Sequence, residues 1–299
     1  MGRESMRLQG IFPALATCFD HEGNLYKTKI FHNVTMLNRI ALSGYVVCGS
    51  TGETPLLTTA ERIQVMEWVR DASAEGKTLI AGVGAEGVHE TVILANRAAE
   101  LGYHAALVLT PHYYRHQMLQ PETQLLYFRA VADRSKLPVM LYNIPQATGC
   151  DLDIETVSAL SHHPNIIGLK DSSGNMEKLP LFVKAVKPGF EVLTGSGGRL
   201  AEALELGATG AVLAIADALP YACVTIWEAF RRRENDAARD WQARIYRAAE
   251  LVPAKLGIGG LKYAMDLNGY YGGPPRLPLL APTAEAKLEI EEAFDGLRS

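Results

Sequence analysis

Residues 138–170 read PVMLYNIPQATGCDLDIETVSALSHHPNIIGLK and contain one complete unit of the predicted fold. Two short apolar runs, Pro138–Tyr142 and Ile166–Lys170, enclose a longer segment with the amphipathic spacing of a helix. Each run is nearly continuous in apolar residues, as is typical of strands that are buried on both faces. The unit is therefore predicted to be a strand, a helix and a second strand.

The same alternation continues along most of the chain. Thr58 and Glu61 match a capping box at a helix start, and Gly102, Gly189 and Gly207 each follow a helical pattern, where a left-handed residue ends a helix. The six other apolar runs are Ile11–Thr17, Gly44–Cys48, Leu79–Val83, Ala105–Leu109, Glu191–Thr194 and Gly210–Ile215. Eight strand–helix units at a period of ~20–35 residues predict a closed (β/α)₈ barrel, the TIM barrel. The alternative is an open doubly wound sheet, which usually carries G-x-G-x-x-G after its first strand; that motif is absent here.

The alternation stops after about Arg231. Three helical patterns follow, at roughly 233–251, 257–268 and 283–297, and the turn-rich segment Gly269–Pro278 separates the last two. We therefore expect a catalytic barrel over residues 1–231 and a C-terminal three-helix region over residues 232–299.

The composition narrows the class of protein. The chain has 299 residues, of which 48% are hydrophobic and 21% charged, and its net charge is −4. This mildly acidic balance argues against a nucleic-acid or membrane-surface binder, and no apolar stretch is long enough to span a membrane. The polar start Met1–Gly10 lacks the apolar core of a signal peptide, so the cytoplasm is the expected location. Four scattered cysteines predict buried, reduced thiols: Cys18, Cys48, Cys150 and Cys223.

Active sites of such barrels lie at the C-terminal ends of the strands. Lys170 ends the sixth run and shares side-chain parity with Ile166 and Gly168, so it is expected to face a partly desolvated pocket. Burial disfavours a charged amine, and a neutral amine can attack a carbonyl and form an imine. The alternative is a lysine that extends into water at a strand end. Tyr142 ends the neighbouring run at the same level and could relay protons; the alternative is a tyrosine at the barrel rim.

Two glycine-rich turns are candidate anion sites. Gly49-Ser50-Thr51-Gly52-Glu53 follows the second run, and its N–H groups and hydroxyls suit a carboxylate, although a tight turn explains it equally well. Gly195-Ser196-Gly197-Gly198 follows the seventh run, where many barrels hold a phosphate, with Arg199 as the nearby cation. No metal site is expected, because His112, His116, His162 and His163 match no metal-binding spacing.

Four motifs together resemble one family. They are Gly49-Ser50-Thr51-Gly52-Glu53, Thr110-Pro111-His112-Tyr113-Tyr114, Tyr142-Asn143-Ile144-Pro145 and Gly168-Leu169-Lys170-Asp171, in this order and spacing. The chain resembles the dihydrodipicolinate synthase / N-acetylneuraminate lyase family from about Gly10 to its C-terminus. The resemblance implies a class I lyase that acts on pyruvate or a related 2-keto acid, without metal or other cofactor.

The resemblance also implies roles for single residues. Lys170 would form the Schiff base, Tyr142 would act as acid and base, and Ser50 would link Tyr142 to Tyr113 of a neighbouring subunit. Ser50 and Thr51 would bind the keto-acid carboxylate. The other implied substrate-binding residues are Gly52, Ser172, Gly195, Ser196 and Val212. Members of the family look like dimers or dimers of dimers, so a homotetramer is expected.

One departure from the family bears on the substrate. Dihydrodipicolinate synthases carry an arginine two residues after the proline of the Tyr142 motif, and Ala147 stands there in this chain. A methyl group cannot replace a cation that grips a carboxylate, although Arg115 or Arg199 could compensate.

Other stretches look like the 4-hydroxy-2-oxoglutarate aldolase branch. They are Tyr113-Tyr114-Arg115, His163-Pro164-Asn165-Ile166, Gly257-Ile258 with Gly260-Leu261-Lys262, and Gly269-Tyr270-Tyr271-Gly272-Gly273-Pro274. This branch is our first expectation and the synthase our second, followed by 2-keto-3-deoxy sugar-acid aldolases or dehydratases. A barrel that binds a keto acid without turnover is the alternative from another class.

Overall fold

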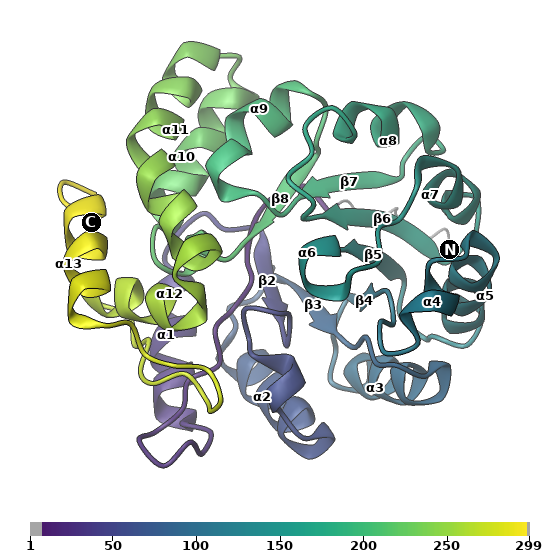
Figure 1. Ribbon diagram of the computed structural model, residues 1–299, viewed down its shortest axis with the longest axis horizontal. Helices are drawn as coiled ribbons and strands as arrows, with labels where there is room; N and C mark the ends of the chain where they lie inside the picture. The colour runs from purple at the N-terminus through teal and green to yellow at the C-terminus, as the bar shows by residue number, and fades with distance from the viewer. Residues whose placement is uncertain (1–7, 298–299) are drawn as a thin grey trace.

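Eight parallel strands form the centre of the molecule in this computed structural model, which describes residues 8–297 (Figure 1). The strands are β1 (Gly10–Pro13), β2 (Gly44–Val47), β3 (Thr78–Gly82), β4 (Ala105–Leu109), β5 (Val139–Asn143), β6 (Ile166–Asp171), β7 (Glu191–Thr194) and β8 (Gly210–Leu213). From β2 to β8 each strand pairs in parallel with the next, and β1 pairs in parallel with β8. The ring closes between β1 and β2, where the N–H of Leu15 donates to the carbonyl of Val46 at 2.9 Å. The predicted closed barrel is confirmed.

Helices surround the strands (Figure 1). Those that follow the eight strands are α1 (Lys27–Leu37), α2 (Thr59–Ala72), α3 (Val88–Glu100), α5 (Pro121–Ala132), α7 (Ile154–Ser161), α8 (Leu179–Ala185), α9 (Leu200–Glu205) and α10 (Pro220–Arg231). Two short helices lie in the loops after β4 and β5, α4 (Arg115–Met118) and α6 (Pro145–Thr148). The capping box of Thr58 and Glu61 is present, and Gly102, Gly189 and Gly207 all have positive φ, as predicted. None of the described helices is long and apolar enough to cross a membrane.

The chain is helical after α10. The last helices are α11 (Asn235–Ala249), a π-helical turn at Glu250–Lys255, α12 (Gly257–Leu267) and α13 (Ala284–Ala293). The C-terminal helical appendix is therefore present, whereas the division into two domains at residue 231 stays a prediction. All four cysteines are free and buried.

The strands bury one side-chain row inside the barrel and the other beneath the helices. The interior row includes Phe12, Val46, Ile80, Leu107, Met140, Tyr142, Leu193 and Val212. One expectation about this pattern is wrong: Ile166 packs in the outer core, not in the interior row with Lys170. The reason is a register shift, because Val139 pairs with Ile166 and Met140 pairs with Gly168, which leaves Ile167 as an extra residue. After this bulge Lys170 still turns inward, against Tyr142.

Arg276 fastens the C-terminal segment to the barrel. Its guanidinium makes a two-point ion pair with Glu61 of α2 at 2.6 and 2.8 Å, and it also donates to the carbonyls of Gly23 and Leu56 at 2.7 and 2.9 Å. The hydrogen bonds from Arg276 hold the pKa of the Glu61 carboxyl at about 2, below its usual 4.5. The charged form of Glu61 is therefore favoured by folding.

We expect Glu61→Gln to destabilise the protein at neutral pH and to do so less in acid. A depressed carboxyl pKa contributes stability that is present above the unfolded value, near 4.5, and is lost as pH falls towards 2. The expected loss at pH 7 is about 1 kcal/mol, because the pair is partly exposed and solvent screens it. Glutamine keeps the oxygen that caps Thr58. Urea unfolding from pH 7 to pH 3 measures the difference, and a difference that does not shrink would contradict the expectation.

Candidate active site

Lys170 and Tyr142 meet at the C-terminal ends of β6 and β5. The two residues are directly paired in the strand register, and each side chain is only 4% exposed. The Nζ of Lys170 lies 4.0 Å from the centroid of the Tyr142 ring. Within residues 8–297, no hydrogen-bond acceptor or ion-pair partner occupies this amine. A buried primary amine without a protein partner is available to a carbonyl compound.

The residues that follow Tyr142 and Lys170 hold their strands together. The Nδ2 of Asn143 donates to Asp171 and to Asp151, both at 2.8 Å. Burial raises the pKa of the Asp171 carboxyl, and hydrogen bonds from Ser173 and Asn143 oppose that rise. Neither Asn143 nor Asp171 was expected from the sequence to have a role of its own. The sequence does contain a signal for both, because each directly follows a candidate catalytic residue at the end of a buried strand.

The turn after β2 brings Ser50 to Tyr142. The two hydroxyls are 3.2 Å apart, so they form a hydrogen bond that passes a proton in either direction. Internal hydrogen bonds close the turn: Gly52 N–H donates to the Gly49 carbonyl at 3.0 Å, and Glu53 N–H donates to the Ser50 carbonyl at 3.1 Å. The N–H groups of Ser50 and Thr51 have no protein acceptor in the described part of the chain. Two adjacent free N–H groups suit an anion.

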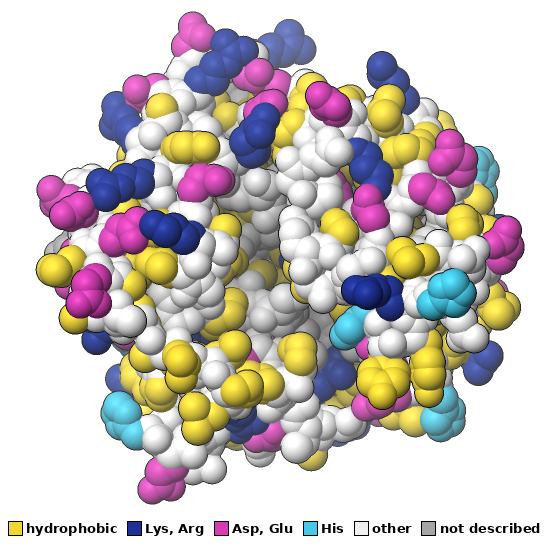
Figure 2. All heavy atoms as spheres, in the orientation of Figure 1, with side chains coloured by type: hydrophobic (Ala, Val, Ile, Leu, Met, Phe, Trp, Pro, Cys, Tyr) yellow, Lys and Arg dark blue, Asp and Glu magenta, His cyan; other side chains and the backbone are white. Residues whose placement is uncertain are grey.

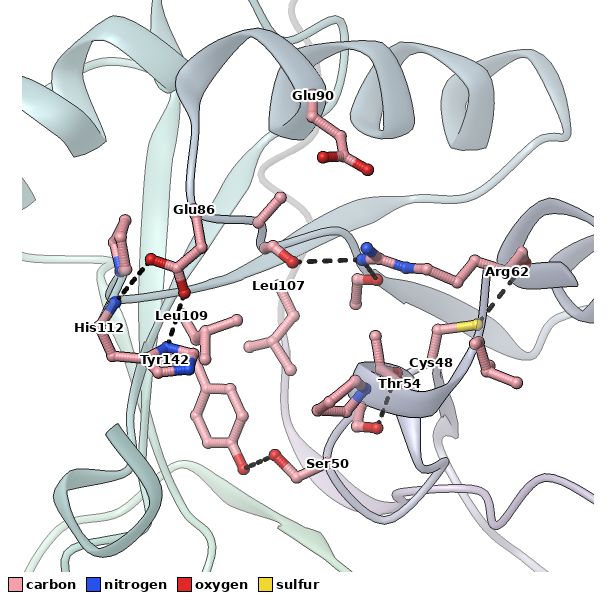
Figure 3. A pocket seen from close by; sticks show the side chains of 17 residues that line it. Cys48, Ser50, Thr54, Arg62, Glu86, Glu90, Leu107, Leu109, His112 and Tyr142 are labelled. Carbon is pink, nitrogen blue, oxygen red and sulfur yellow. Dashed lines mark hydrogen bonds and ion pairs between the residues drawn. The ribbon is translucent and has the colours of Figure 1, made fainter. Parts of the chain in front are cut away.

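A cavity of about 320 Å³ opens beside this hydrogen bond. Figure 3 shows Ser50 and Tyr142 pointing towards each other at one end, with Arg62 and Glu86 farther along the wall. Arg62 is a buried cation that donates to the carbonyls of Gly82 and Gly84 at 2.9 and 3.3 Å, and burial lowers its pKa. Lys170 does not line this cavity, but its amine lies against the ring of Tyr142, which does. The face drawn in Figure 2 is hollowed near its centre.

Tyr113 lies apart from the other candidate catalytic residues. Its side chain is 78% exposed, and within residues 8–297 no hydrogen bond joins it to Ser50 or Tyr142. Glu86 fixes the loop instead, since its carboxylate accepts the N–H groups of His112 and Tyr113 at 3.0 and 2.9 Å. The structure therefore brings Lys170, Tyr142 and Ser50 together but leaves Tyr113 at the surface.

Ser172 and Gly195 pack closely beside the end of β6. A Cβ at Gly195 would lie 1.9 Å from the Ser172 hydroxyl, so only glycine fits there. The N–H of Gly195 donates to the Asp171 carbonyl at 2.7 Å, and the N–H of Ser196 donates to the Thr194 hydroxyl at 3.1 Å. Val212 is buried in the barrel interior.

The turn after β7 does not favour a phosphate. The N–H groups of Gly195 and Ser196 already donate to protein acceptors. A Cβ at Gly198 would lie 2.1 Å from a carboxylate oxygen of Glu250. The nearby cation Arg199 forms a two-point pair with Glu202. An anion at this turn would meet a carboxylate of like charge and a neutralised arginine.

Arg115 lies beside the segment that carries Ala147. A Cβ at Gly149 would lie 3.0 Å from its Cδ and 3.1 Å from its Nη1, and Arg115, Ala147 and Thr148 line one surface groove. No carboxylate pairs with Arg115 within residues 8–297. Of the two arginines considered as substitutes for the arginine missing at 147, only Arg115 is near that position and unpaired.

Three of the four histidines considered above, His112, His162 and His163, have protein partners. His112 pairs with Glu86 and His163 with Asp133, each at 3.0 Å. Among the described residues, no group of three or more histidine, cysteine, aspartate or glutamate side chains is arranged to hold a metal ion.

The chain is similar to known proteins over almost its whole length. The family model described as the dihydrodipicolinate synthetase family matches residues 7–296. A 4-hydroxy-tetrahydrodipicolinate synthase of Methanothrix thermoacetophila is 35% identical over 96% of each chain. A mitochondrial protein of Emericella nidulans, named a probable 4-hydroxy-2-oxoglutarate aldolase, is 34% identical over 95% of this chain and 93% of its own. A prophage protein of the dihydrodipicolinic acid synthase family from E. coli K12, solved with pyruvate, superposes with a TM-score of 0.91 at 27% identity, covering 97% and 98% of the two chains.

Proposed function

Because the chain belongs to the dihydrodipicolinate synthetase family and is a lyase, we propose that it cleaves 4-hydroxy-2-oxoglutarate, or a close 4-hydroxy-2-keto acid, through a Schiff base on Lys170. The observation that carries the proposal is the unpartnered amine of Lys170, buried against the ring of Tyr142 at the end of β6. Two observations favour the 4-hydroxy-2-oxoglutarate aldolase branch. Ala147 stands where the synthases carry an arginine, and a relative at 34% identity is named a probable aldolase of this kind.

The proposed reaction uses the amine as an electron sink. The Lys170 amine attacks the C2 carbonyl, and loss of water gives an imine. Tyr142, connected to Ser50, gives its proton to the departing hydroxide as the imine forms and then, as a phenolate, takes the proton of the 4-hydroxyl as the C3–C4 bond breaks. The electron pair of that bond moves into the imine and leaves an enamine, while glyoxylate departs as an aldehyde. A proton returns to C3, and water then releases pyruvate and the free amine.

The two carboxylates of the substrate require separate partners. We assign the carboxylate next to the keto group to the free N–H groups of Ser50 and Thr51, with Gly52 closing the turn. Ser172, Gly195, Ser196 and Val212 would complete the wall on the other side of Lys170. We assign the distal carboxylate to Arg115, which is the unpaired cation near Ala147. A charge-assisted pair gives this arginine a role in substrate choice.

Arg115→Ala is expected to lower kcat/KM for cleavage of 4-hydroxy-2-oxoglutarate about ten- to a hundredfold, because a charge-assisted hydrogen bond contributes roughly 1.5–3 kcal/mol. Arg199→Ala is the matched control and is expected to leave cleavage unchanged, since Arg199 is paired with Glu202. Steady-state kinetics of both variants measure the effect. If Arg199→Ala lost activity while Arg115→Ala kept it, the assignment of the distal carboxylate to Arg115 would be contradicted.

Ala147→Arg is expected to raise the condensation of pyruvate with aspartate semialdehyde and to lower aldol cleavage. The native protein should cleave more efficiently than it condenses. A coupled assay of kcat/KM for both reactions, in both proteins, tests this. If the native protein condenses as efficiently as it cleaves, the synthase function replaces the aldolase function as the better proposal.

We also propose that the active enzyme is a cytoplasmic homotetramer in which Tyr113 completes the Ser50–Tyr142 relay of a neighbouring subunit. The support is the exposed aromatic pair of Tyr113 and Tyr114, whose rings lie 5.2 Å apart, since exposed aromatic residues are frequent interface anchors. Tyr113→Phe and Tyr142→Phe are each expected to be impaired, and mixed oligomers of the two should regain part of the native activity. A mixture with no gain would contradict action across subunits.

A further inference from the structure

One ion pair joins the C-terminal helices to the turn after β2. The Nζ of Lys262 on α12 lies 2.5 Å from Oε1 of Glu53, and both side chains are 0% exposed. Among the ion pairs of residues 8–297, no other has both side chains fully buried. The pair connects residues that are far apart in the sequence, at the end of the Ser50–Thr51 turn.

Each residue of this pair makes a further polar contact. Lys262 also donates to the carbonyl of Pro274 at 3.0 Å and lies 4.6 Å from the centroid of the Phe19 ring. The second oxygen of Glu53 accepts the N–H of Arg276 at 2.7 Å. Burial lowers the pKa of the Lys262 amine, and the charge of Glu53 opposes that shift.

Stability alone does not account for such a pair. Taking two charges out of water costs several kcal/mol each, and apolar residues of similar volume are often at least as stabilising. Removing one partner is a different matter, because it leaves an uncompensated buried charge. A fully buried pair therefore suggests a role in holding one particular conformation, which here is that of the backbone at Glu53.

Glu53 holds a left-handed backbone conformation. Its φ of 56° and ψ of 32° are uncommon for a residue with a side chain, and they persist only where the surroundings enforce them. Its N–H closes the turn onto the carbonyl of Ser50. The side chain of Glu53, anchored by Lys262 and Arg276, therefore fixes the end of the turn whose free N–H groups belong to Ser50 and Thr51.

We propose that Lys262 and Glu53 are positioning residues that hold the Ser50–Thr51 turn in the geometry that binds the keto-acid carboxylate. Both side chains are fully buried in their own ion pair, so neither is expected to touch the substrate. The inference rests on the proposed function, in which this turn binds a 2-keto acid. It goes beyond that function because it assigns the C-terminal helices a part in substrate affinity.

The test compares four variants: Glu53→Gln, Lys262→Met, the double variant, and Lys255→Met as a control from the exposed Lys255–Glu289 pair. Each is incubated with increasing pyruvate and reduced with borohydride, and the labelled fraction is measured by intact mass. We expect the double variant to need about tenfold more pyruvate for half-maximal labelling, with an unchanged maximum. Lys255→Met should behave as the native protein does.

Thermal unfolding of the same proteins separates positioning from stability. The single variants are expected to be less stable than the native protein, and the double variant should recover most of that loss because it buries no unpaired charge. A double variant that is stable but needs more pyruvate for half-maximal labelling supports a positioning role for the pair. A double variant that matches the native protein both in stability and in the pyruvate concentration for half-maximal labelling would overturn this role, because the pair would then only balance charge. A native protein that pyruvate does not label would instead contradict the proposed function.

Discussion

Replacing Lys170 by alanine is expected to lower kcat by several orders of magnitude. The imine is the electron sink for C3–C4 cleavage, and without it the electron pair of the breaking bond has no acceptor in the proposed mechanism. The side chain is buried and unpartnered, so its removal disrupts no ion pair in the described structure. The variant should therefore fold, and its circular dichroism and oligomeric state should match those of the native protein.

Lys170→Arg provides a matched control for charge. Arginine keeps a cation near Tyr142 but does not form the imine, because its guanidinium stays protonated. Both variants are expected to be inactive in the cleavage assay. If Lys170→Arg kept activity within about tenfold of the native value, the amine would act only as a charge, and the covalent mechanism would be wrong.

Tyr142→Phe is expected to lower kcat by about 10²- to 10⁴-fold, the usual contribution of a positioned general acid or base. The change removes only the hydroxyl that bonds to Ser50 and keeps the ring that packs against Lys170. Tyr127→Phe is the matched control, since Tyr127 is also buried and its hydroxyl bonds to Thr91 at 2.9 Å on the helical side of the barrel. Steady-state kinetics compare the two, and equal losses would show that Tyr142 has no special role.

Imine formation in Tyr142→Phe provides a second measurement. If Tyr142 moves protons in the steps that form and resolve the imine, labelling by pyruvate and borohydride should be slower but should still reach Lys170. Complete labelling at the native rate, with the same loss of kcat, would limit the role of Tyr142 to the cleavage step.

The strands, and the contact between Lys170 and Tyr142, were predictable because the local pattern of apolar residues determines them. Strands buried on both faces appear as continuous apolar runs, and neighbouring parallel strands bring their ends to the same level. The bulge at Ile167 was not predictable, because its causes lie in the pairing with β5 and not in the run itself. The parity expected for Ile166 was therefore wrong, although the inward direction of Lys170 was correct.

Contacts between distant residues explain what the sequence did not reveal. Glu53 belongs to a recognised motif and Lys262 to another, but no spacing rule pairs positions on opposite ends of the chain. The engagement of Arg199 by Glu202 and the position of Arg115 beside Gly149 likewise depend on how the loops fold. Sequence alone left both arginines open as partners of a carboxylate, and the geometry favours Arg115.

The Schiff-base mechanism is tested most directly by the identity of the residue that pyruvate labels. The native protein is incubated with pyruvate, reduced with borohydride, digested, and sequenced by mass spectrometry. We expect one reduced pyruvate unit per chain, located on Lys170, together with loss of activity. Absence of a label, a label on another lysine such as Lys178 or Lys262, or labelling that persists unchanged in Lys170→Ala would contradict it.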